Sequence, residues 1–290
     1  MTLLALKNGR GPNPTLLRSA FLTSLEYTYL LYLIRHQIDM FNTFHQSNFK
    51  RAVKHLFARR KKNVVLVEAH FGLGDNLICL GLMRTLAEKN PDIRYHLACL
   101  PQYFHSIAWM LQSSKNIFPT VVTSGREARQ LANFLNATYQ TIGIHNIDIK
   151  RFDESFYEEY GIPFEYRWSN AAVSPGPQSD ELYKRLNPQN EPFMLVCRTE
   201  SGNNTYPLKI ENRSNLKVIE IYPATQNIYD WTKLVENAAE IHSIDTSFLH
   251  FVENVLYEKP SGKLFYHLAK KKLKSAFTRK LPWALVDYDN

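Results

Sequence analysis

"NVVLVEAHFGLGDNLICLGLMRTLAEKNPDIRYHLACL", residues 63–100, decides the fold class. Its first six residues include five that fit a strand buried on both faces. A glycine turn follows, then a helical pattern that Pro91 ends, then a second apolar run at residues 93–100. Gly81 within the helical pattern would let that helix lie close to a sheet. A strand, a helix and a second strand in this order predict a parallel sheet covered by helices.

The same alternation continues along the chain. The small, polar, Pro-containing stretch "SNAAVSPGPQS", residues 169–179, is typical of a linker. We therefore expect an α/β protein with two Rossmann-like doubly wound halves facing a cleft, at residues 63–172 and 173–290. Further strands are predicted at residues 118–123, 139–146, 192–198, 216–223, 240–245 and 262–268. Further helices are predicted at residues 126–137, 230–239 (with Asp230 as N-cap) and 246–257, and a basic helix is expected after residue 268.

Residues 1–62 are expected to form a basic helical extension. Their most apolar stretch, residues 20–41, contains Glu26, Arg35, His36 and Asp39, so it is too polar to span a membrane. Its helical spacing favours a packed amphipathic helix over a helix lying on a membrane surface. The first residues are a poor match to a signal peptide. A cytoplasmic protein is expected, with a peripheral position on the inner membrane face left open.

The formal net charge of +8 is concentrated in two basic blocks. Such blocks suit nucleic acid, anionic lipid or an acidic glycan, or they are simply solvated surface. Nucleic acid is the weakest of these partners because no helix-turn-helix, zinc finger or RNP-type strand accompanies the charge. The first block contains Lys50, Arg51, Lys54, Arg59, Arg60, Lys61 and Lys62. The second block contains Lys259, Lys263, Lys270, Lys271, Lys272, Lys274, Arg279 and Lys280.

Cys79, Cys99 and Cys197 each lie in an apolar stretch, without CxxC or zinc spacing. We expect buried free thiols, and neither a metal site nor a cofactor is predicted.

The turn "HFGLGDN", residues 70–76, is the first candidate site. A glycine turn between a strand and a helix favours an anionic ligand at the helix N-terminus. Leu77 stands where a dinucleotide-binding pattern requires its third glycine, and the lysine of a phosphate loop is missing. NAD and nucleoside triphosphates are therefore disfavoured. Gly74 and Asp75 remain as ligand-site candidates, and a helix N-cap is the alternative role for Asp75.

The junction "IDTSFLH", residues 244–250, is the second candidate site. The amides of Thr246, Ser247 and Phe248 would be unpaired donors in the first turn of a helix, which suits a diphosphate. The alternative is that Asp245 or Thr246 merely caps that helix. His250 follows on the first turn, where a lone histidine is more often structural. At the end of the strand 192–198, Arg198 could neutralise phosphate charge, or it could form a surface salt bridge with Glu200.

Three stretches together resemble the heptosyltransferase-like glycosyltransferases of family nine: "GLGDNL" (72–77), "LMRTLAEKNPD" (82–92) and "AAEIHSIDTSFLHFVENVLYEKP" (238–260). The resemblance implies a GT-B fold, inversion at the anomeric carbon and no bound metal. It implies that Asp75 is the general base on the acceptor, and that Asp245, Thr246 and Ser247 hold the donor sugar and its diphosphate. Arg198 matches a phosphate-binding position only loosely. Ser247 departs from the family's glycine, and Gly81 stands where proline is common.

The leading hypothesis is therefore a glycosyltransferase. It would move a sugar from a nucleotide-sugar donor to a glycan or lipid-linked acceptor, with peripheral contact to an anionic membrane and without nucleic acid. The alternatives are a catalytically inert GT-B-like protein that binds nucleotide-sugar or glycan, and a basic interaction protein whose two halves only support the charged blocks.

Overall fold

The computed structural model describes residues 63–288 except 146, 201 and 270–277. The predicted extension at residues 1–62 lies outside the described residues, and so does most of the predicted basic helix after residue 268. Among the helices that are described, none is long and apolar enough to cross a membrane.

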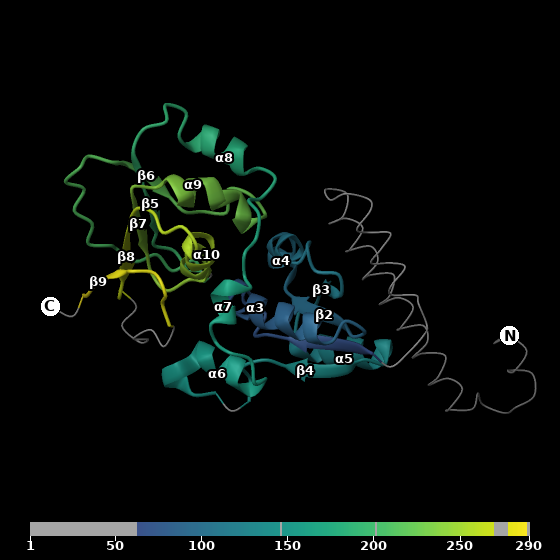
Figure 1. The fold of residues 1–290 in the computed structure, drawn as a ribbon. Helices are drawn as coiled ribbons and strands as arrows, with labels where there is room; N and C mark the ends of the chain where they lie inside the picture. Colours follow the sequence, from purple (N-terminus) through teal and green to yellow (C-terminus); the bar gives the residue numbers. More distant parts are fainter. Residues whose placement is uncertain (1–62, 146, 201, 270–277, 289–290) are drawn as a thin grey trace, which may run out of the picture. The chain divides into compact units, whose positions relative to one another are not determined.

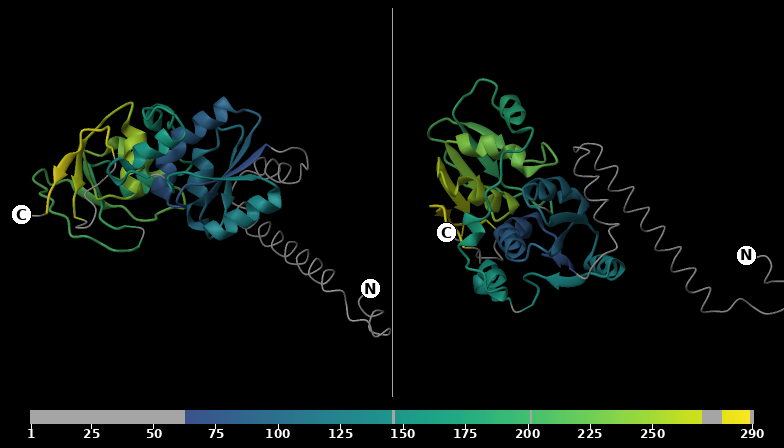
Figure 2. Two further views of the ribbon diagram at one scale, coloured as in Figure 1. Left: turned by 90° about the horizontal axis from the view of Figure 1, so that it is seen from below. Right: turned by 45° about the vertical axis from the view of Figure 1, so that its right-hand side comes forward.

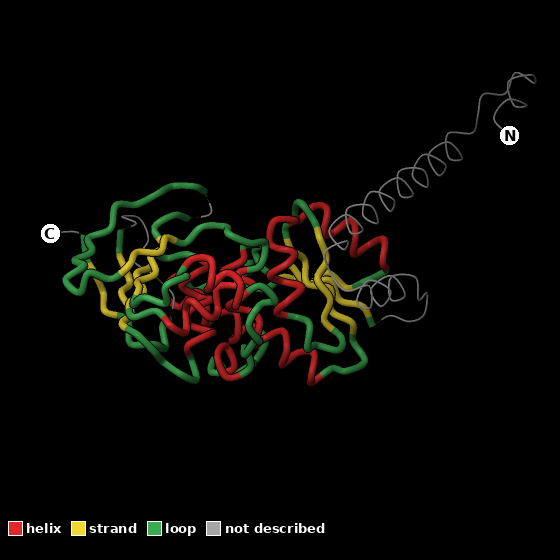
Figure 3. The backbone as a smooth tube through the Cα atoms, turned by 90° about the horizontal axis from the view of Figure 1, so that it is seen from above, coloured by secondary structure: helices red, strands yellow, loops and turns green. Residues whose placement is uncertain are grey.

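The first sheet has four strands, all parallel, in the order β3-β2-β1-β4 (Figure 1). The strand order reverses at β1, so the crossover helices lie on both sides of the sheet (Figure 3). The strands are β1 (Val64–Glu68), β2 (Arg94–Cys99), β3 (Ile117–Val121) and β4 (Thr138–Thr141). Its helices are α3 (Leu73–Lys89), η2 (Pro101–Tyr103), α4 (Phe104–Met110) and α5 (Gly125–Leu135).

The second sheet has five parallel strands in the order β6-β5-β7-β8-β9, reversing at β5. Its strands are β5 (Phe193–Cys197), β6 (Lys217–Glu220), β7 (Glu240–Ser243), β8 (Lys263–His267) and β9 (Ala284–Val286). Its helices are η4 (Ile228–Trp231), α9 (Thr232–Asn237) and α10 (Ser247–Leu256). The segment between the sheets forms η3 (Ile149–Arg151), α6 (Phe152–Glu159), α7 (Tyr166–Ser169) and α8 (Ser179–Leu186). The predicted α/β class with two doubly wound sheets is confirmed; β9 was missed.

Helix α3 lies at the centre of this arrangement and is buried on nearly every side. Residues 76–83 are all buried, which fits a helix that is apolar all round. It contacts α7 and α10 away from its own sheet, and α3 and α10 lie side by side (Figures 1 and 2). The first sheet and the second are therefore joined through a shared apolar core.

The role predicted for Gly81 is corrected by this packing. A Cβ atom on Gly81 would lie 1.8 Å from the carbonyl oxygen of Tyr166 and 3.2 Å from the Cα of Arg167. Gly81 therefore admits the backbone of α7, and no strand of the sheet meets it at this distance. The reason is that Gly81 lies on the side of α3 that receives the backbone of α7, where a side chain would leave no room for it.

The predicted linker has no regular structure between α7 and α8, but hydrogen bonds fix it at several points. Arg84 Nη1 donates to the carbonyls of Asn170 and Ala172 at 3.2 and 2.7 Å. Trp109 Nε1 donates to the carbonyl of Ser174 at 3.0 Å. The Gly176 amide donates to the carbonyl of Tyr229 at 2.8 Å. The linker is therefore anchored to elements of both sheets.

The prediction that Asp230 caps the following helix is wrong. A 3-10 turn, η4, runs directly into α9, and Asp230 lies inside this turn. Asn227 is the capping residue, since its side chain accepts from the Tyr229 amide at 3.1 Å. The carboxylate of Asp230 instead accepts from the Gln178 amide at 2.9 Å, at the end of the linker. The three cysteines are buried and free, as predicted.

Candidate functional site

The turn after β1 has a strained backbone. His70 and Phe71 are consecutive non-glycine residues with φ angles of 51° and 55°. This left-handed conformation costs free energy for such side chains and is found mostly where the surroundings impose it. The imidazole Nε2 of His70 is hydrogen-bonded to the carbonyl of Gly143, which follows β4. The turn is therefore fixed at the carboxyl ends of β1 and β4, where the strand order reverses and ligands of such sheets bind.

Asp75 lies on the first turn of α3 and is not its N-cap. That position belongs to Gly72, which has no side chain to cap the helix. The Asp75 carboxylate bends back over the turn, because a Cβ atom on Gly72 would lie 2.5 Å from its Oδ2. Burial raises the pKa of Asp75 above its ordinary 3.8, and the charge of His70 and a backbone hydrogen bond lower it in part. A carboxylate of this kind is a stronger base than an exposed one.

The start of α10 is the second part of the site. Thr246 is its N-cap, in extended conformation, and the Thr246 side chain makes no capping hydrogen bond. The hydroxyl of Thr246 instead lies 3.5 Å from the Cys197 Sγ, at the adjacent carboxyl ends of β5 and β7. The alternative that Thr246 caps this helix through its side chain is therefore wrong. The first turn of α10 lies where the second sheet reverses its strand order, and its amides donate no hydrogen bond to the Thr246 side chain.

These two parts of the site meet. A Cβ atom on Gly74 would lie 3.5 Å from the Cα of Ser247 and 3.2 Å from Cδ2 of His250. One turn further along, the Asn254 side chain donates to the carbonyl of Leu77 at 3.3 Å. The turn that carries Asp75 and the start of α10 are therefore adjacent, although the sequence separates them by most of the described chain.

The other residues that the sequence predicts for the donor-binding site have different surroundings. Asp245 is partly buried between β7 and α10, whereas Phe248 belongs to the core. His250 is also fully enclosed, and its Nδ1 lies 3.1 Å from Nη2 of Arg167. Burial, with the charge of Arg167, holds the pKa of His250 well below its ordinary value. His250 is thus a neutral histidine behind the first turn of α10.

Arg198 forms an ion pair, with a partner other than the predicted one. Its guanidinium makes two contacts with the carboxylate of Glu220, one of them from Nε to Oε2 at 3.0 Å. The parallel register of β5 and β6 sets Val196 level with Glu220, so the two side chains meet at the edge of the sheet. Glu200 instead accepts from the side chain of Asn204 at 2.6 Å.

A buried polar network behind the site was not predicted. Arg167 is 1% exposed and pairs with Asp153, which is fully buried, as well as with His250. Burial lowers the pKa of Arg167 to about 10, and the charge of Glu253 raises it in part. "EYRWSN" reads like a surface turn, so no local pattern could have identified this arginine.

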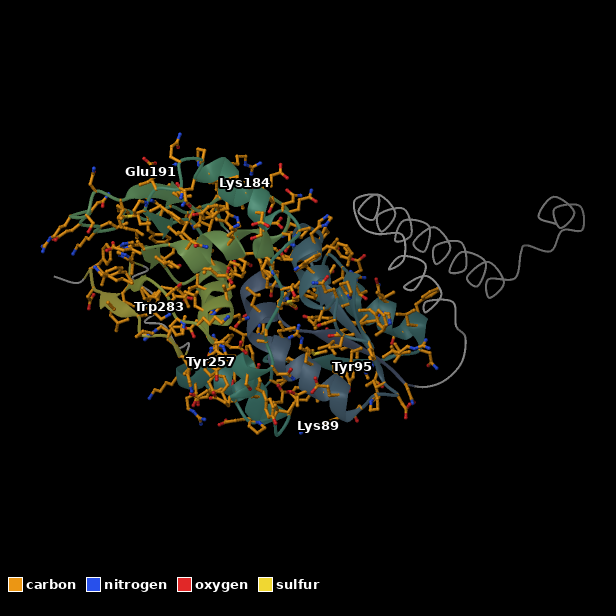
Figure 4. The ribbon with its side chains drawn as sticks, turned by 45° about the horizontal axis from the view of Figure 1, so that its top comes forward. Lys89, Tyr95, Lys184, Glu191, Tyr257 and Trp283 are labelled. Atoms are coloured by element: carbon orange, nitrogen blue, oxygen red, sulfur yellow. The ribbon has the colours of Figure 1, made fainter. Side chains whose placement is uncertain are left out.

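Glu253 on α10 joins the C-terminal segment to the same region. Its carboxylate accepts from the indoles of Trp168 and Trp283 at 3.0 and 2.6 Å, and from the amides of Lys280 and Leu281 at 2.9 and 3.2 Å. Tyr257, just beyond α10, donates to Glu165 at 2.7 Å; Figure 4 labels Tyr257 and Trp283. Among the described residues, no three His, Cys, Asp or Glu side chains are grouped to hold a metal ion.

Sequence comparisons find no counterpart for this chain. No protein-family model matches it. No curated protein matches it either.

Solved structures do resemble it. One is a glycosyltransferase of family 9 from Veillonella parvula, with 10% identity and a TM-score of 0.49, covering 79% of this chain and 88% of that one. The E. coli ADP-heptose LPS heptosyltransferase II has 10% identity and a TM-score of 0.49, over 71% and 84% of the two chains. The E. coli heptosyltransferase WaaC with ADP has 10% identity and a TM-score of 0.41, over 77% and 90%. The first bears the name of the family that the sequence resembles, and identities this low concern the fold alone.

Proposed function

We propose that the protein is a glycosyltransferase that moves a sugar from a nucleotide-sugar donor to an acceptor hydroxyl. The observation that carries this proposal is the approach of Gly74 to Ser247. It puts a half-buried carboxylate, Asp75, next to a helix start whose N-cap side chain makes no capping hydrogen bond. A base and an anion site side by side are the two elements that an inverting sugar transfer requires.

Asp75 acts as the general base in this proposal. Its oxygen accepts the proton of the acceptor hydroxyl as that oxygen attacks the anomeric carbon of the donor sugar. Burial favours this role, because a raised pKa makes the Asp75 carboxylate a stronger base. The strained turn at His70 and Phe71 holds the first turn of α3 in place, so the carboxylate is oriented before the substrate arrives.

The start of α10 stabilises the leaving nucleoside diphosphate. Its first-turn amides and the positive end of the helix dipole act on the charge that develops as the glycosidic bond breaks. The hydroxyls of Thr246 and Ser247 add donors at the same point. Asp245, which precedes them, would contact the donor sugar. Attack from one side and departure on the other invert the anomeric centre, and the helix start supplies the charge stabilisation without a metal.

The finer assignments form part of the same proposal. Residues 63–172 bind the acceptor, a glycan or lipid-linked glycan, and residues 173–290 bind the nucleotide sugar. Arg198 can contribute to the diphosphate site by exchanging Glu220 for phosphate. The basic blocks motivate a position at the cytoplasmic face of a membrane, with anionic lipid as the partner.

A catalytically inert protein that binds nucleotide sugar or glycan is the second candidate. The ion pair of Arg198 with Glu220 favours it, because this pair occupies the cation that would meet the diphosphate. Ser247 in place of the family's glycine also favours it, because its side chain restricts how closely a phosphate approaches the backbone. Both candidates predict nucleotide binding, so only turnover distinguishes them.

The test has two stages. A thermal-shift screen with UDP, GDP, ADP and CMP sugars identifies the donor, since a ligand that binds the folded state raises Tm. Release of the free nucleotide is then measured for the native chain, for Asp75→Asn and for Asp92→Asn, an exposed control beyond α3. We expect binding by all three proteins and loss of turnover in Asp75→Asn alone. Binding without turnover in the native chain would support the inert protein, and full activity in Asp75→Asn would refute the assigned base.

A further inference from the structure

Arg167 connects three elements that the chain places far apart. It lies on α7, pairs with Asp153 on α6, and reaches His250 on α10 at 3.1 Å from its Nη2. Its Nη1 also donates to the carbonyl of Thr278 at 3.0 Å. All three charged or titratable side chains, Asp153, Arg167 and His250, are buried. An ion pair removed from water in this way holds its members in one geometry.

The contact between Arg167 and His250 determines which imidazole nitrogen carries the proton. A guanidinium has donors and no acceptor, so Nδ1 of His250 must be the acceptor. The neutral ring therefore carries its proton on Nε2. Asp153 fixes the guanidinium from the other side, and its own carboxylate accepts from the Thr278 amide at 3.1 and 3.3 Å. The tautomer of His250 is thus imposed by α6 and α7, outside the helix to which His250 belongs.

The Nε2 edge of the same ring faces the candidate site. Cδ2, which is bonded to Nε2, is the nearest atom to a Cβ placed on Gly74, at 3.2 Å. Ser247, one turn before His250, is the next residue that this Cβ would meet, at 3.5 Å from its Cα. The imidazole therefore lies between the buried ion pair of Arg167 and Asp153 on one side and the Gly74 turn, residues 70–76, on the other. A change in its orientation or protonation would displace the start of α10 relative to Asp75.

We propose that Arg167, fixed by Asp153, is a positioning residue that holds His250 as the neutral Nε2–H tautomer and thereby sets the first turn of α10 against the Gly74 turn. The tautomer follows from the contacts alone. Its consequence for sugar transfer rests on the proposed function, in which Asp75 and the α10 start act on the same substrate. Arg167 contacts no reacting atom in this scheme.

The tautomer is tested by imidazole ¹⁵N NMR on the full chain with labelled histidine, using His250→Gln to assign the signal. We expect the neutral Nε2–H pattern in the native protein, with the ring still unprotonated at its ordinary pKa of about 6.5. The double variant Asp153→Asn/Arg167→Met removes both charges together, and should give a mixture of tautomers or a titrating ring. A native His250 protonated on Nδ1, or an unchanged signal in a folded double variant, would overturn the inference.

The positioning role is tested by kinetics with the donor found in the thermal-shift screen. A displaced α10 start should lower kcat about 10²-fold in the double variant, with a much smaller change in donor KM. Arg167→Lys keeps a charged hydrogen-bond donor at this position, so its kcat should lie between those of the native protein and the double variant. Arg151→Met is the matched control, because Arg151 pairs with Glu154 and Glu158 on the exposed side of α6.

The two proposals fail in different ways. A native chain without turnover but with the expected tautomer contradicts the transferase and leaves the tautomer assignment standing. An active chain whose rate is unaffected by the double variant contradicts the positioning role and leaves the transferase standing.

Discussion

Gly74 at the start of α3 lies close to Ser247 at the start of α10. A Cβ atom added to Gly74 would lie 3.5 Å from the Ser247 Cα. Helix α3 follows β1, at which the first sheet reverses its strand order, and α10 follows β7, which pairs with β5, the strand at which the second sheet reverses. Two helix starts whose N-cap residues make no side-chain capping bond therefore meet, and the carboxylate of Asp75 is beside them. This contact is the basis for the proposed site and for the first prediction.

Asp75→Asn should abolish transfer and stabilise the protein. Folding raises the pKa of Asp75, so its favourable contribution is fully present below about pH 3.8 and is lost as pH rises through the folded-state pKa. Above the folded-state pKa the charged carboxylate destabilises the fold, and the neutral amide of Asn removes that cost. Urea unfolding at pH 7 should show a higher free energy of unfolding, while turnover falls at least about 10²-fold. Asp92→Asn should change neither quantity, and a destabilised Asp75→Asn would contradict the argument.

Gly81→Ala should destabilise the protein despite the higher helix propensity of alanine. The added Cβ would lie 1.8 Å from the Tyr166 carbonyl oxygen, so the backbone of α7 would have to move. Overpacking of this kind costs about 2 kcal/mol, which exceeds the gain of about 1 kcal/mol in propensity. Denaturant unfolding measures the difference. Gly202→Ala, where the new Cβ meets its nearest atom at 3.4 Å, is the control. If Gly81→Ala and Gly202→Ala have the same free energy of unfolding, α7 can shift to admit the new Cβ, and the prediction is wrong.

Glu253→Gln should release the C-terminal segment from α10. Two indole N–H groups and two backbone amides converge on this carboxylate, and an amide offers only one oxygen to them. Leaving buried donors unpaired should cost about 3 kcal/mol of stability. Chemical denaturation followed by tryptophan fluorescence reports the loss, since Trp168 and Trp283 are both partners. Glu258→Gln, on an exposed residue after α10, should leave the midpoint unchanged.

Acid should weaken the second sheet through a pair of buried histidines. Nδ1 of His242 lies 2.9 Å from Nε2 of His267. Nδ1 of His267 lies 2.8 Å from the hydroxyl of Tyr288. Glu240 faces the other nitrogen of His242. Burial first, and then the charge of His242, lowers the pKa of His267 to about 4. Burial also lowers the pKa of His242, and Glu240 raises it in part.

Because these pKa values are depressed on folding, the unfolded state binds more protons between about pH 6.5 and pH 4, and stability falls as pH falls through this window. The loss from His267 should be on the order of 3 kcal/mol, at about 1.4 kcal/mol for each pKa unit. Urea midpoints measured from pH 7 to pH 4 test this. His267→Gln should flatten the acid side of the profile, whereas His145→Gln, on an exposed loop residue, should not. A profile that His267→Gln leaves unchanged would contradict the assignment.

The sequence predicted the strands and the glycine turn well because their signals are local. The apolar run at residues 63–70 and the Pro91 stop indicated β1, α3 and β2 to within a few residues. By contrast, β9 was missed because its three residues are partly exposed at a sheet edge and carry no clear apolar pattern. The sequence wrongly predicts Asp230 as a cap because a 3-10 turn ahead of α9 has no distinctive sequence signal.

The candidate site shows the same division. Gly74, Asp75 and the junction at residues 245–247 were identified from turn chemistry and from a family resemblance. Arg167 and Asp153 were not, because a charged side chain in a polar stretch looks exposed until another part of the chain covers it. Arg198 was expected to pair with a neighbour in sequence, and the strand register gave it Glu220 instead.

By itself, then, the sequence determined the α/β class, the two parallel sheets and the two turns that end their central strands. These features follow from periodicity and from backbone preferences, which act over a few residues. Only the tertiary structure decided that Gly74 meets Ser247, that α7 lies on Gly81, and that a buried ion pair sets the protonation of His250. Those contacts depend on which apolar faces are buried together, and burial is a property of the whole folded chain.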